Sequence, residues 1–340
     1  MSIVFLTGGS GFVGRNLIRA LVASGYRVKA LARSERSAEV VRQLGAEPVI
    51  GDLLDEQVLR IGLQGAAAMI HAAADTDHGG DDPVQDRVNV EGTRLVFRLA
   101  REAGVRRALQ ISTESVLADG APIIEADEAW PIPARHAGGY ARTKAAAERA
   151  ALAEAGEGFV VCAIRPRFVW GRDDTSALPE IIDAVKSGRL KWIAGGHYRT
   201  STAHVANVAA GALAALERGQ TGQVYFITDG APQEFRAFLT RMLATHGVAP
   251  PTGSVPRWLL KSVIAVGAWL QQLTGGRIKP PISRQEYATV GHEVTVRDDR
   301  ARRELGYVPV ISVAEGLAEM APGGLWSPHA DTLASTRSAD

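Results

Sequence analysis

Residues 2–14 read SIVFLTGGSGFVG, an apolar run that passes into a glycine cluster. The run 2–6 has the apolar, β-branched composition of a strand buried in a parallel sheet. Gly8, Gly11 and Gly14 follow in the spacing G-x-x-G-x-x-G. In that order they permit a tight turn, a close approach of backbone to a pyrophosphate, and packing of a helix on the strand. A helix that begins near Phe12 would direct free N–H groups toward phosphates, so the pattern predicts a dinucleotide-binding unit.

Composition bounds the class of protein. The 340 residues are enough for two domains, or for one large α/β unit with an appended lobe. The net charge of +1 gives no electrostatic case for a nucleic-acid partner. The single cysteine, Cys162, lies in an apolar run and fits a reducing compartment. Because the chain shows no secretory pattern and no window of about 18 apolar residues, we expect a cytoplasmic protein without a membrane span.

The residues after the second expected strand, 26–32, bear on the choice of cofactor. An acidic residue at the tip of this strand would bind the ribose hydroxyls of NAD, whereas a basic residue accommodates the 2′-phosphate of NADP. The tip here carries no acid and is followed by Arg33, Ser34 and, two residues on, Arg36. We therefore favour NADP(H), read by Arg33 and Ser34, with NAD as the alternative. In the other interpretation, Arg33 and Arg36 only solvate a loop.

A hydroxyl pair and a Tyr-Lys pair supply the candidate chemistry. The expected strand 107–111 delivers Ser112 and Thr113 at its carboxyl end, where open parallel sheets bind ligands. Tyr140 and Lys144 stand four residues apart on an expected helix and so share one face. A free tyrosine has a pKa near 10, about three units too high for efficient proton exchange at neutral pH. A nearby ammonium group favours the phenolate and is expected to lower that pKa.

Five strings occur in one order along the chain: TGGSGFVG at 7–14, HAAA at 71–74, VNVEGT at 88–93, ISTESV at 111–116 and YARTK at 140–144. In this combination the chain resembles the extended short-chain dehydrogenase/reductases, the NAD-dependent epimerase/dehydratase family. The later strings RPRFVWGRDD at 165–174 and VYFITDG at 224–230 are similar to the 3β-hydroxysteroid dehydrogenase and dihydroflavonol reductase branch. The resemblance implies an α/β fold: a Rossmann-type, doubly wound parallel sheet with a smaller, mostly helical substrate-binding lobe.

The resemblance also implies roles for individual residues. Tyr140, Lys144 and Thr113 would be catalytic, Asn89 would support the active-site wall, and alignment selects Thr113 over Ser112. The residues that would contact the cofactor, besides Tyr140, Lys144, Arg33 and Ser34, are Thr7, Gly8, Ser10, Gly11, Phe12, Val13, Gly14, Asp52, Leu53, His71, Ala72, Ala73 and Pro166.

The same resemblance divides the chain into a dinucleotide-binding domain, 1–171, to which 202–230 returns, and a substrate-binding lobe made of 172–201 and 231–320. The small, polar residues 321–340 are expected to be disordered. Helices over 89–103 and 140–155 form a dimer seam in many relatives, so a homodimer is a possible assembly.

Three further segments have more than one interpretation. The apolar helix expected at 258–273 is interpreted as a pocket lid rather than as a helix resting on a membrane surface, because Lys261 is its only charge. The polar loop around Asp75, Asp77 and His78 is interpreted as an active-site rim, and no metal site is expected. Arg167 either orients a substrate carboxylate or pairs with an acid, and His204 is expected to be a packing or anchoring residue.

Two departures from sugar-nucleotide epimerases and dehydratases narrow the activity. Phe168 stands where those enzymes carry Asn, and Glu114-Ser115 replaces the Asp-Glu pair of the dehydratases. We therefore predict an NADP(H)-dependent oxidoreductase that interconverts a secondary alcohol and a ketone on a largely apolar small molecule, of hydroxysteroid, β-keto acid or flavonoid type. A sugar-nucleotide epimerase or dehydratase is one alternative. A non-catalytic NADP(H)-sensing protein is the other.

Overall fold

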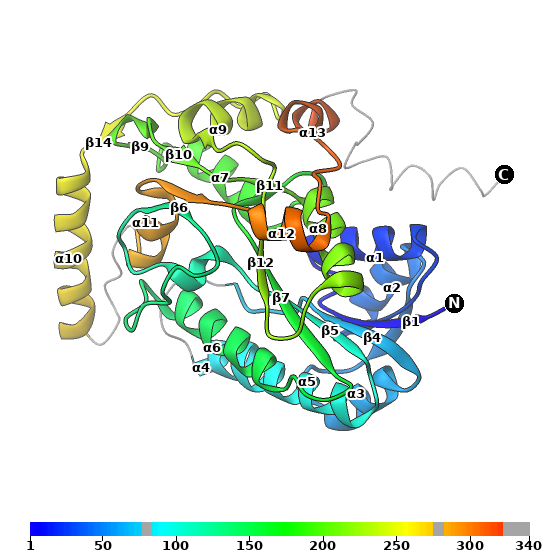
Figure 1. Ribbon diagram of the computed structural model, residues 1–340. Helices are drawn as coiled ribbons and strands as arrows, with labels where there is room; N and C mark the ends of the chain where they lie inside the picture. The colour runs from blue at the N-terminus through cyan, green and yellow to red at the C-terminus, as the bar shows by residue number, and fades with distance from the viewer. Residues whose placement is uncertain (77–82, 275–281, 322–340) are drawn as a thin grey trace.

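Seven parallel strands form the central sheet of the computed structural model, which describes residues 1–76, 83–274 and 282–321 (Figure 1). The strand order is β12-β7-β5-β4-β1-β2-β3, so the chain builds outward from β1 in one direction and then, from β4, in the other. Ligands bind at such a reversal, at the carboxyl ends of the strands. In chain order the strands are β1 Ile3–Thr7, β2 Arg27–Ala32, β3 Glu47–Ile50, β4 Ala66–His71, β5 Arg107–Ile111, β7 Val160–Pro166 and β12 Val224–Ile227.

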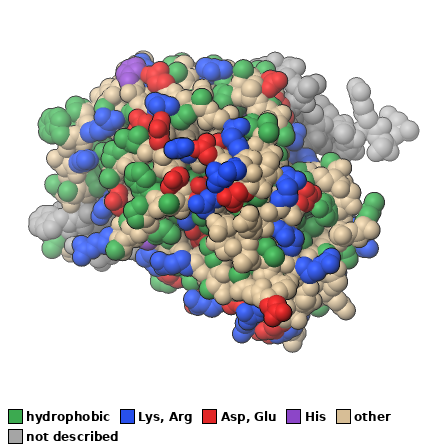
Figure 2. Space-filling model, viewed as in Figure 1, with side chains coloured by type: hydrophobic (Ala, Val, Ile, Leu, Met, Phe, Trp, Pro, Cys, Tyr) green, Lys and Arg blue, Asp and Glu red, His purple; other side chains and the backbone are tan. Residues whose placement is uncertain are grey.

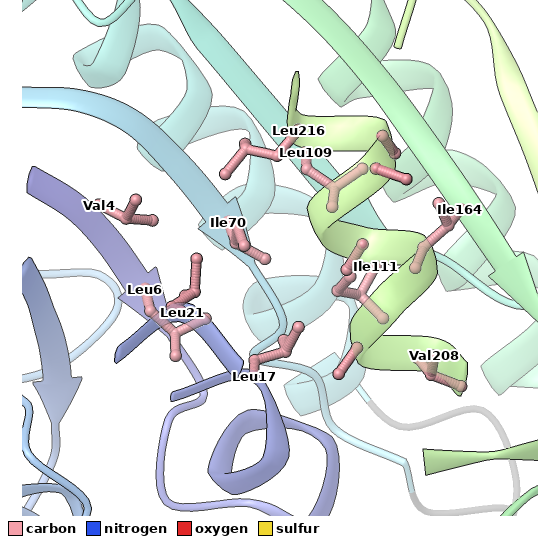
Figure 3. Close-up of a cluster of buried hydrophobic side chains, with 14 of the residues drawn as sticks. Val4, Leu6, Leu17, Leu21, Ile70, Leu109, Ile111, Ile164, Val208 and Leu216 are labelled. Atoms are coloured by element: carbon pink, nitrogen blue, oxygen red, sulfur yellow. The ribbon is translucent and has the colours of Figure 1, made fainter. Parts of the chain in front are cut away.

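Helices cover both faces of this sheet, as a doubly wound fold requires (Figure 1). On one face Leu17 and Leu21, one turn apart on α1, belong to the same buried apolar cluster as Ile70 of β4 and Val208 of α8, residues that Figure 3 labels. On the other face Phe97 of α5 lies in a second apolar cluster. The first layer comprises α1 Phe12–Ala23, α2 Glu35–Gln43, α8 Val205–Arg218 and α12 Asp299–Leu305, and the second α3 Glu56–Leu63, α5 Gly92–Glu102 and α6 Gly139–Ala153.

A smaller lobe, mostly helical, lies beyond the carboxyl ends of the strands (Figure 1). Its core is aromatic: the Trp170 ring meets the Phe238 ring edge-on at 5.2 Å, and Tyr198 stacks on Phe235. Its helices are α7 Ala177–Lys186, α9 Phe235–Ala244, α10 Arg257–Leu273, α11 Arg284–Val290 and α13 Val313–Met320.

The short strands of the described residues form three smaller sheets, separate from the central one. In a four-stranded sheet, β6 pairs in parallel with β15, so residues early in the chain are built into the lobe. The division of the chain at 171, 202 and 231 stays a prediction. The short strands are β6 Ile123–Ala126, β8 Val169–Trp170, β9 Trp192–Ile193, β10 Arg199–Thr200, β11 Ala203–His204, β13 Gln233–Glu234, β14 Ser254–Val255 and β15 Val294–Val296.

Helix α10 stands at the outer edge of the lobe (Figure 1). Ile264 packs against Ile193 and Tyr287, whereas Trp258 is 70% exposed and Val266 is 56% exposed. Apolar side chains also gather at this edge in Figure 2, while cationic and anionic side chains are interspersed over the rest of the face in view. In the described part of the chain no helix is long and apolar enough to cross a membrane. The lid interpretation of α10 stays a prediction.

Two predicted segments fall outside the described residues. These are the rim residues Asp77 and His78, and the tail 322–340.

Candidate active site

The glycine loop between β1 and α1 is shaped by close backbone contacts. Gly8 has a φ of +74°, and a Cβ there would lie 2.6 Å from the carbonyl carbon of Ala72, the residue that follows β4. A Cβ on Gly14 would lie 2.0 Å from the Gly8 carbonyl oxygen, so only glycine lets α1 pack this closely. Gly11 differs, because a Cβ there would make an ordinary contact of 3.4 Å. Gly8 and Gly14 therefore fix the loop, and Gly11 leaves its outer surface open.

The N-terminus of α1 has no side-chain cap, as is also true of α6, α7 and α9. Gly11 is its N-cap, and no side chain bonds to its first N–H groups. By contrast, the side chain of Asp55 caps α3 and the side chain of Ser312 caps α13. The first N–H groups of α1, at the carboxyl end of β1, are therefore not bonded to a side chain, which is the arrangement in which helix N-termini bind anions.

His71, at the end of β4, is buried in a hydrogen-bonded network. Its Nδ1 lies 2.6 Å from Thr7 Oγ1, and its Nε2 lies 3.0 Å from Thr93 Oγ1. The Thr93 hydroxyl donates its proton to the Asn89 carbonyl, so toward His71 it can only accept, and the His71 proton is assigned to Nε2. The unprotonated Nδ1 of His71 then accepts from the Thr7 hydroxyl. Burial, together with the charge of Lys144, lowers the pKa of His71 to about 3. The imidazole is neutral and holds the sheet edge together, while its own contact with a cofactor stays a prediction.

The residues predicted to read the adenosine half of the cofactor lie at the ends of β2 and β3. Arg33 is exposed directly after β2. The Ser34 hydroxyl accepts from the Ser37 N–H and caps α2, a role that the sequence reasoning missed. The Asp52 carboxylate accepts from the Leu54 N–H at 2.9 Å, and Leu53 is buried. Arg33, Ser34 and Asp52 are all exposed at this edge of the sheet, and Arg33 is the only cation among the three.

Asn89 joins the loop after β4 to α6. Its side chain donates to the Asp75 carbonyl at 2.9 Å and to Thr143 Oγ1 at 3.1 Å, and it accepts from the Asp75 N–H at 2.7 Å. It lies in a π-helical segment, Asp86–Glu91, between the short helix α4 Pro83–Gln85 and α5, where the sequence predicted one uninterrupted helix. Such wide turns are frequent at functional sites. The geometry fits a supporting role for Asn89.

Tyr140, in the first turn of α6, lies beside the residues that follow β5. Burial and the charge of Glu114 raise its pKa above the ordinary value, whereas a hydrogen bond with Thr113 lowers it. The Thr113 hydroxyl lies 2.9 Å from a carboxylate oxygen of Glu114. The expectation that the ammonium of Lys144 lowers the pKa of Tyr140 is wrong: burial and the charge of Glu114 raise that pKa, and the downward effect comes from the hydrogen bond with Thr113. Thr113 and Tyr140 are brought together as predicted.

Lys144 lies one turn along α6 and is fully inside the protein. Its ammonium donates to the Ile111 carbonyl at 2.8 Å, at the end of β5. Burial lowers its pKa to about 8, and the charge of Glu148 opposes this shift. Tyr140 and Lys144 therefore occupy one helix face, with Lys144 deeper and close to a carboxylate that the sequence reasoning missed.

That carboxylate forms a buried ion pair. Glu148 accepts from Arg165 Nε at 2.8 Å and from Arg165 Nη2 at 2.5 Å, and both side chains are about 97% buried or more. The Ser112 hydroxyl donates to the same carboxylate at 2.6 Å. Of the two candidate hydroxyls, Ser112 is thus committed to the core, while Thr113 contacts Tyr140. A glutamate four residues after Lys144 and an arginine before Pro166 were the available sequence signals.

Arg167 pairs with an acid, one of its two predicted roles. Its Nη1 lies 3.1 Å from Glu114, and Nη2 donates to the Thr289 carbonyl at 2.5 Å. The next residue, Phe168, has a φ of +44°, and its ring meets the Phe238 ring at 5.8 Å. Phe168 thus belongs to the aromatic core, at the position where a sugar-nucleotide enzyme would carry a polar amide.

His204 and its neighbours anchor the chain, as expected. His204 Nδ1 accepts from the Ala206 N–H and caps α8. Asn207 bonds to the Ile311 backbone and to Asp229, which also accepts from the indole N–H of Trp170 at 2.7 Å. Among the described residues no cluster of His, Cys, Asp and Glu could hold a metal ion.

Comparison with known proteins assigns the family. The model of the 3-beta hydroxysteroid dehydrogenase/isomerase family matches residues 5–257. The chain is 45% identical to a 4-hydroxy-2-methyl-3-oxo-4-farnesyl-3,4-dihydroquinoline-1-oxide ketoreductase of Stigmatella aurantiaca, over 94% of this chain and 96% of the relative. It is 31% identical to a 3-beta-hydroxysteroid dehydrogenase of Mycolicibacterium neoaurum, over 94% and 90% of the two chains.

A solved structure shares the whole architecture. The crystal structure of gox2253 superposes with a TM-score of 0.76 at 29% identity, covering 93% of this chain and 96% of that one. The two relatives are named as a ketoreductase and a hydroxysteroid dehydrogenase, both of them oxidoreductases. The protein is therefore an oxidoreductase that belongs to the 3-beta hydroxysteroid dehydrogenase/isomerase family.

Proposed function

We propose that the protein is an NADP(H)-dependent ketoreductase or alcohol dehydrogenase that acts on a largely apolar substrate. The observation that carries this proposal is the placement of Thr113, Tyr140 and Lys144 at the carboxyl end of β5. The substrate class is supported by the 45% identical relative, whose name gives a farnesylated 3-oxo compound as its substrate.

The residues around the glycine loop fit a nicotinamide dinucleotide. Gly8 and Gly14 leave no room for a Cβ, so the loop holds one compact shape beneath the first turn of α1. That turn has no side-chain cap, which leaves its N–H groups to a diphosphate. Phe12, Val13 and the backbone of Ser10 would line the diphosphate, with Ala72, Ala73 and Pro166 along the sheet edge.

The chemical step follows from the positions of the three side chains. A bound nicotinamide supplies the hydride in reduction and accepts it in oxidation. Tyr140 gives its phenolic proton to the carbonyl oxygen in reduction, and the Thr113 hydroxyl, once it rotates away from Glu114, donates to the same oxygen. Lys144 places a positive charge one helical turn from Tyr140 and stabilises the phenolate that remains.

A comparison of variants tests the catalytic assignment. Replacing Tyr140 with Phe should lower kcat at least 100-fold, because the proton donor is lost, while the dissociation constant for the cofactor stays within about threefold. Thr113→Ala should lower kcat by about 10- to 100-fold. Its matched control is Ser112→Ala, which removes the neighbouring hydroxyl and should leave kcat within about threefold. Near-normal turnover by Tyr140→Phe would refute the assignment and would favour a cofactor-sensing protein.

The preference for NADP(H) rests on Arg33, exposed after β2 with no acid at the strand tip. Arg33→Ala should weaken NADPH binding about 10- to 100-fold and leave NADH binding unchanged, since a charge-assisted bond to the 2′-phosphate is lost. The control is Arg36→Ala, which removes an exposed cation in the first turn of α2. Tighter binding of NADH than of NADPH by the unaltered protein would contradict this assignment.

A further inference from the structure

The charge beside the reacting hydroxyls is that of a buried ion pair. Glu114 and Arg167 are only 4% and 2% exposed, and Arg167 Nη1 lies 3.1 Å from the carboxylate. The same carboxylate accepts from the Thr113 hydroxyl at 2.9 Å, and its charge raises the pKa of Tyr140. Glu114 is therefore in direct contact with one of the two groups that would hold a substrate carbonyl.

Arg167 is held away from any ligand by its own contacts. Besides Glu114, its guanidinium donates to the Thr289 carbonyl and packs over the Phe168 ring. The Nε of Arg167 is buried without a hydrogen-bond partner, so one N–H of the guanidinium has no acceptor. If Glu114 were neutral, Arg167 would lack a counter-charge and could bind a different anion.

The other two buried cations near Tyr140 are also compensated. Arg165 is bidentate on Glu148, whereas Lys144 donates to the neutral Ile111 carbonyl and is compensated only through space, by the charge of the same Glu148. In the part of the chain that the structure describes, the buried charge nearest the Thr113 hydroxyl is thus the anionic carboxylate of Glu114. A carboxylate on the carbon next to the substrate carbonyl would approach this anion and would find Arg167 already neutralised.

We propose that Glu114 is a specificity-determining residue, which neutralises Arg167 and makes the site select ketones that carry no carboxylate beside the carbonyl. This inference rests on the proposed function and narrows its substrate class to neutral ketones, against the β-keto acids. A substrate carboxylate would lose its hydration beside this neutralised pair without gaining a free counter-charge, which should lower kcat/KM about 100-fold.

Matched pairs of substrates test the inference. Methyl esters of 3-oxo acids, on alkyl chains and on a 3-oxosteroid ring, are compared with the free acids, with spontaneous decarboxylation of the acids followed in parallel without enzyme. The unaltered protein should favour each ester over its acid by about 100-fold in kcat/KM. If acid and ester are turned over within threefold of each other, the inference is wrong while the proposed function stands. If no ketone is turned over with NADPH or NADH, the proposed function itself fails, and this inference with it.

Variants separate charge from the greater apolarity of the esters. Glu114→Gln frees Arg167 and should reduce the ester-to-acid ratio at least 10-fold, chiefly through a lower KM for the acid. Glu114→Gln combined with Arg167→Met leaves no uncompensated buried charge, so this double variant can be tested if the single variant does not fold. Its ester-to-acid ratio should lie between that of the unaltered protein and that of Glu114→Gln. Glu102→Gln removes an exposed acid on α5 and is the control. An unchanged ratio in both Glu114 variants would overturn the inference.

Discussion

Arg165 Nε lies 2.8 Å from a carboxylate oxygen of Glu148, and this ion pair lies directly beneath the proposed catalytic groups. Glu148 is one turn after Lys144 on α6 and also accepts from Ser112 at the end of β5. The pair thus fastens α6 to the sheet at the level of Lys144. It connects the stability of the core to the electrostatics of the site.

Removal of one partner should therefore be costly. Glu148→Gln leaves the Arg165 guanidinium buried without its counter-charge, and we expect a loss of about 3–5 kcal/mol in the free energy of unfolding. Glu148→Leu combined with Arg165→Met should recover most of that loss, because a buried ion pair contributes little compared with apolar side chains of similar size. Urea titrations of the three proteins measure both effects. A single variant as stable as the double variant would contradict this account.

Lys144 gives the site a predicted dependence on alkaline pH. Its pKa in the folded protein is lowered to about 8 from 10.5, so above about pH 8 the ammonium that stabilises the phenolate is lost and kcat should fall. The same shift affects the free energy of unfolding in the opposite direction. Between about pH 8 and 10.5 the unfolded chain keeps a proton that the folded chain has released, so this group's contribution to stability rises with pH.

The pH profile of kcat in the Glu148 variants checks the assignment. The carboxylate of Glu148 raises the pKa of Lys144, so Glu148→Gln should move the alkaline limb to lower pH. A limb that does not move would assign the titration to a group other than Lys144.

His71 should make the protein sensitive to acid. Its pKa is lowered from 6.5 to about 3, so below about pH 6.5 the unfolded chain binds a proton that the folded chain does not. Stability is fully present above that pH and declines toward pH 3, by a total on the order of 4 kcal/mol. His71→Gln should flatten this decline, and the exposed His246→Gln should not. Unfolding free energies between pH 7 and 4 decide the matter, and equal slopes in all three proteins would rule out His71 as the cause.

Local sequence patterns predicted the strands and helices closely, whereas they did not predict contacts between residues distant in the sequence. The strand 107–111 was predicted with the bounds that β5 has, because an apolar run between turn residues encodes a strand locally. The pairing of Glu148 with Arg165 depends on how α6 lies against β7, which no periodicity records. The net effect of burial on Tyr140 could not be derived either, since desolvation depends on packing in three dimensions.

The two glycines of the loop should separate folding from cofactor binding. Gly14→Ala forces a Cβ to within 2.0 Å of the Gly8 carbonyl, so α1 must move from the sheet and the protein should lose several kcal/mol of stability. Gly11→Ala places its Cβ 3.4 Å from the same oxygen, so it should fold normally. Its methyl group would nonetheless cover the surface that the diphosphate approaches, and we expect NADPH binding to weaken at least 10-fold. Thermal unfolding and a fluorescence titration with NADPH measure the two effects. If Gly11→Ala bound the cofactor as tightly as the unaltered protein, the diphosphate would have to lie elsewhere than over the first turn of α1.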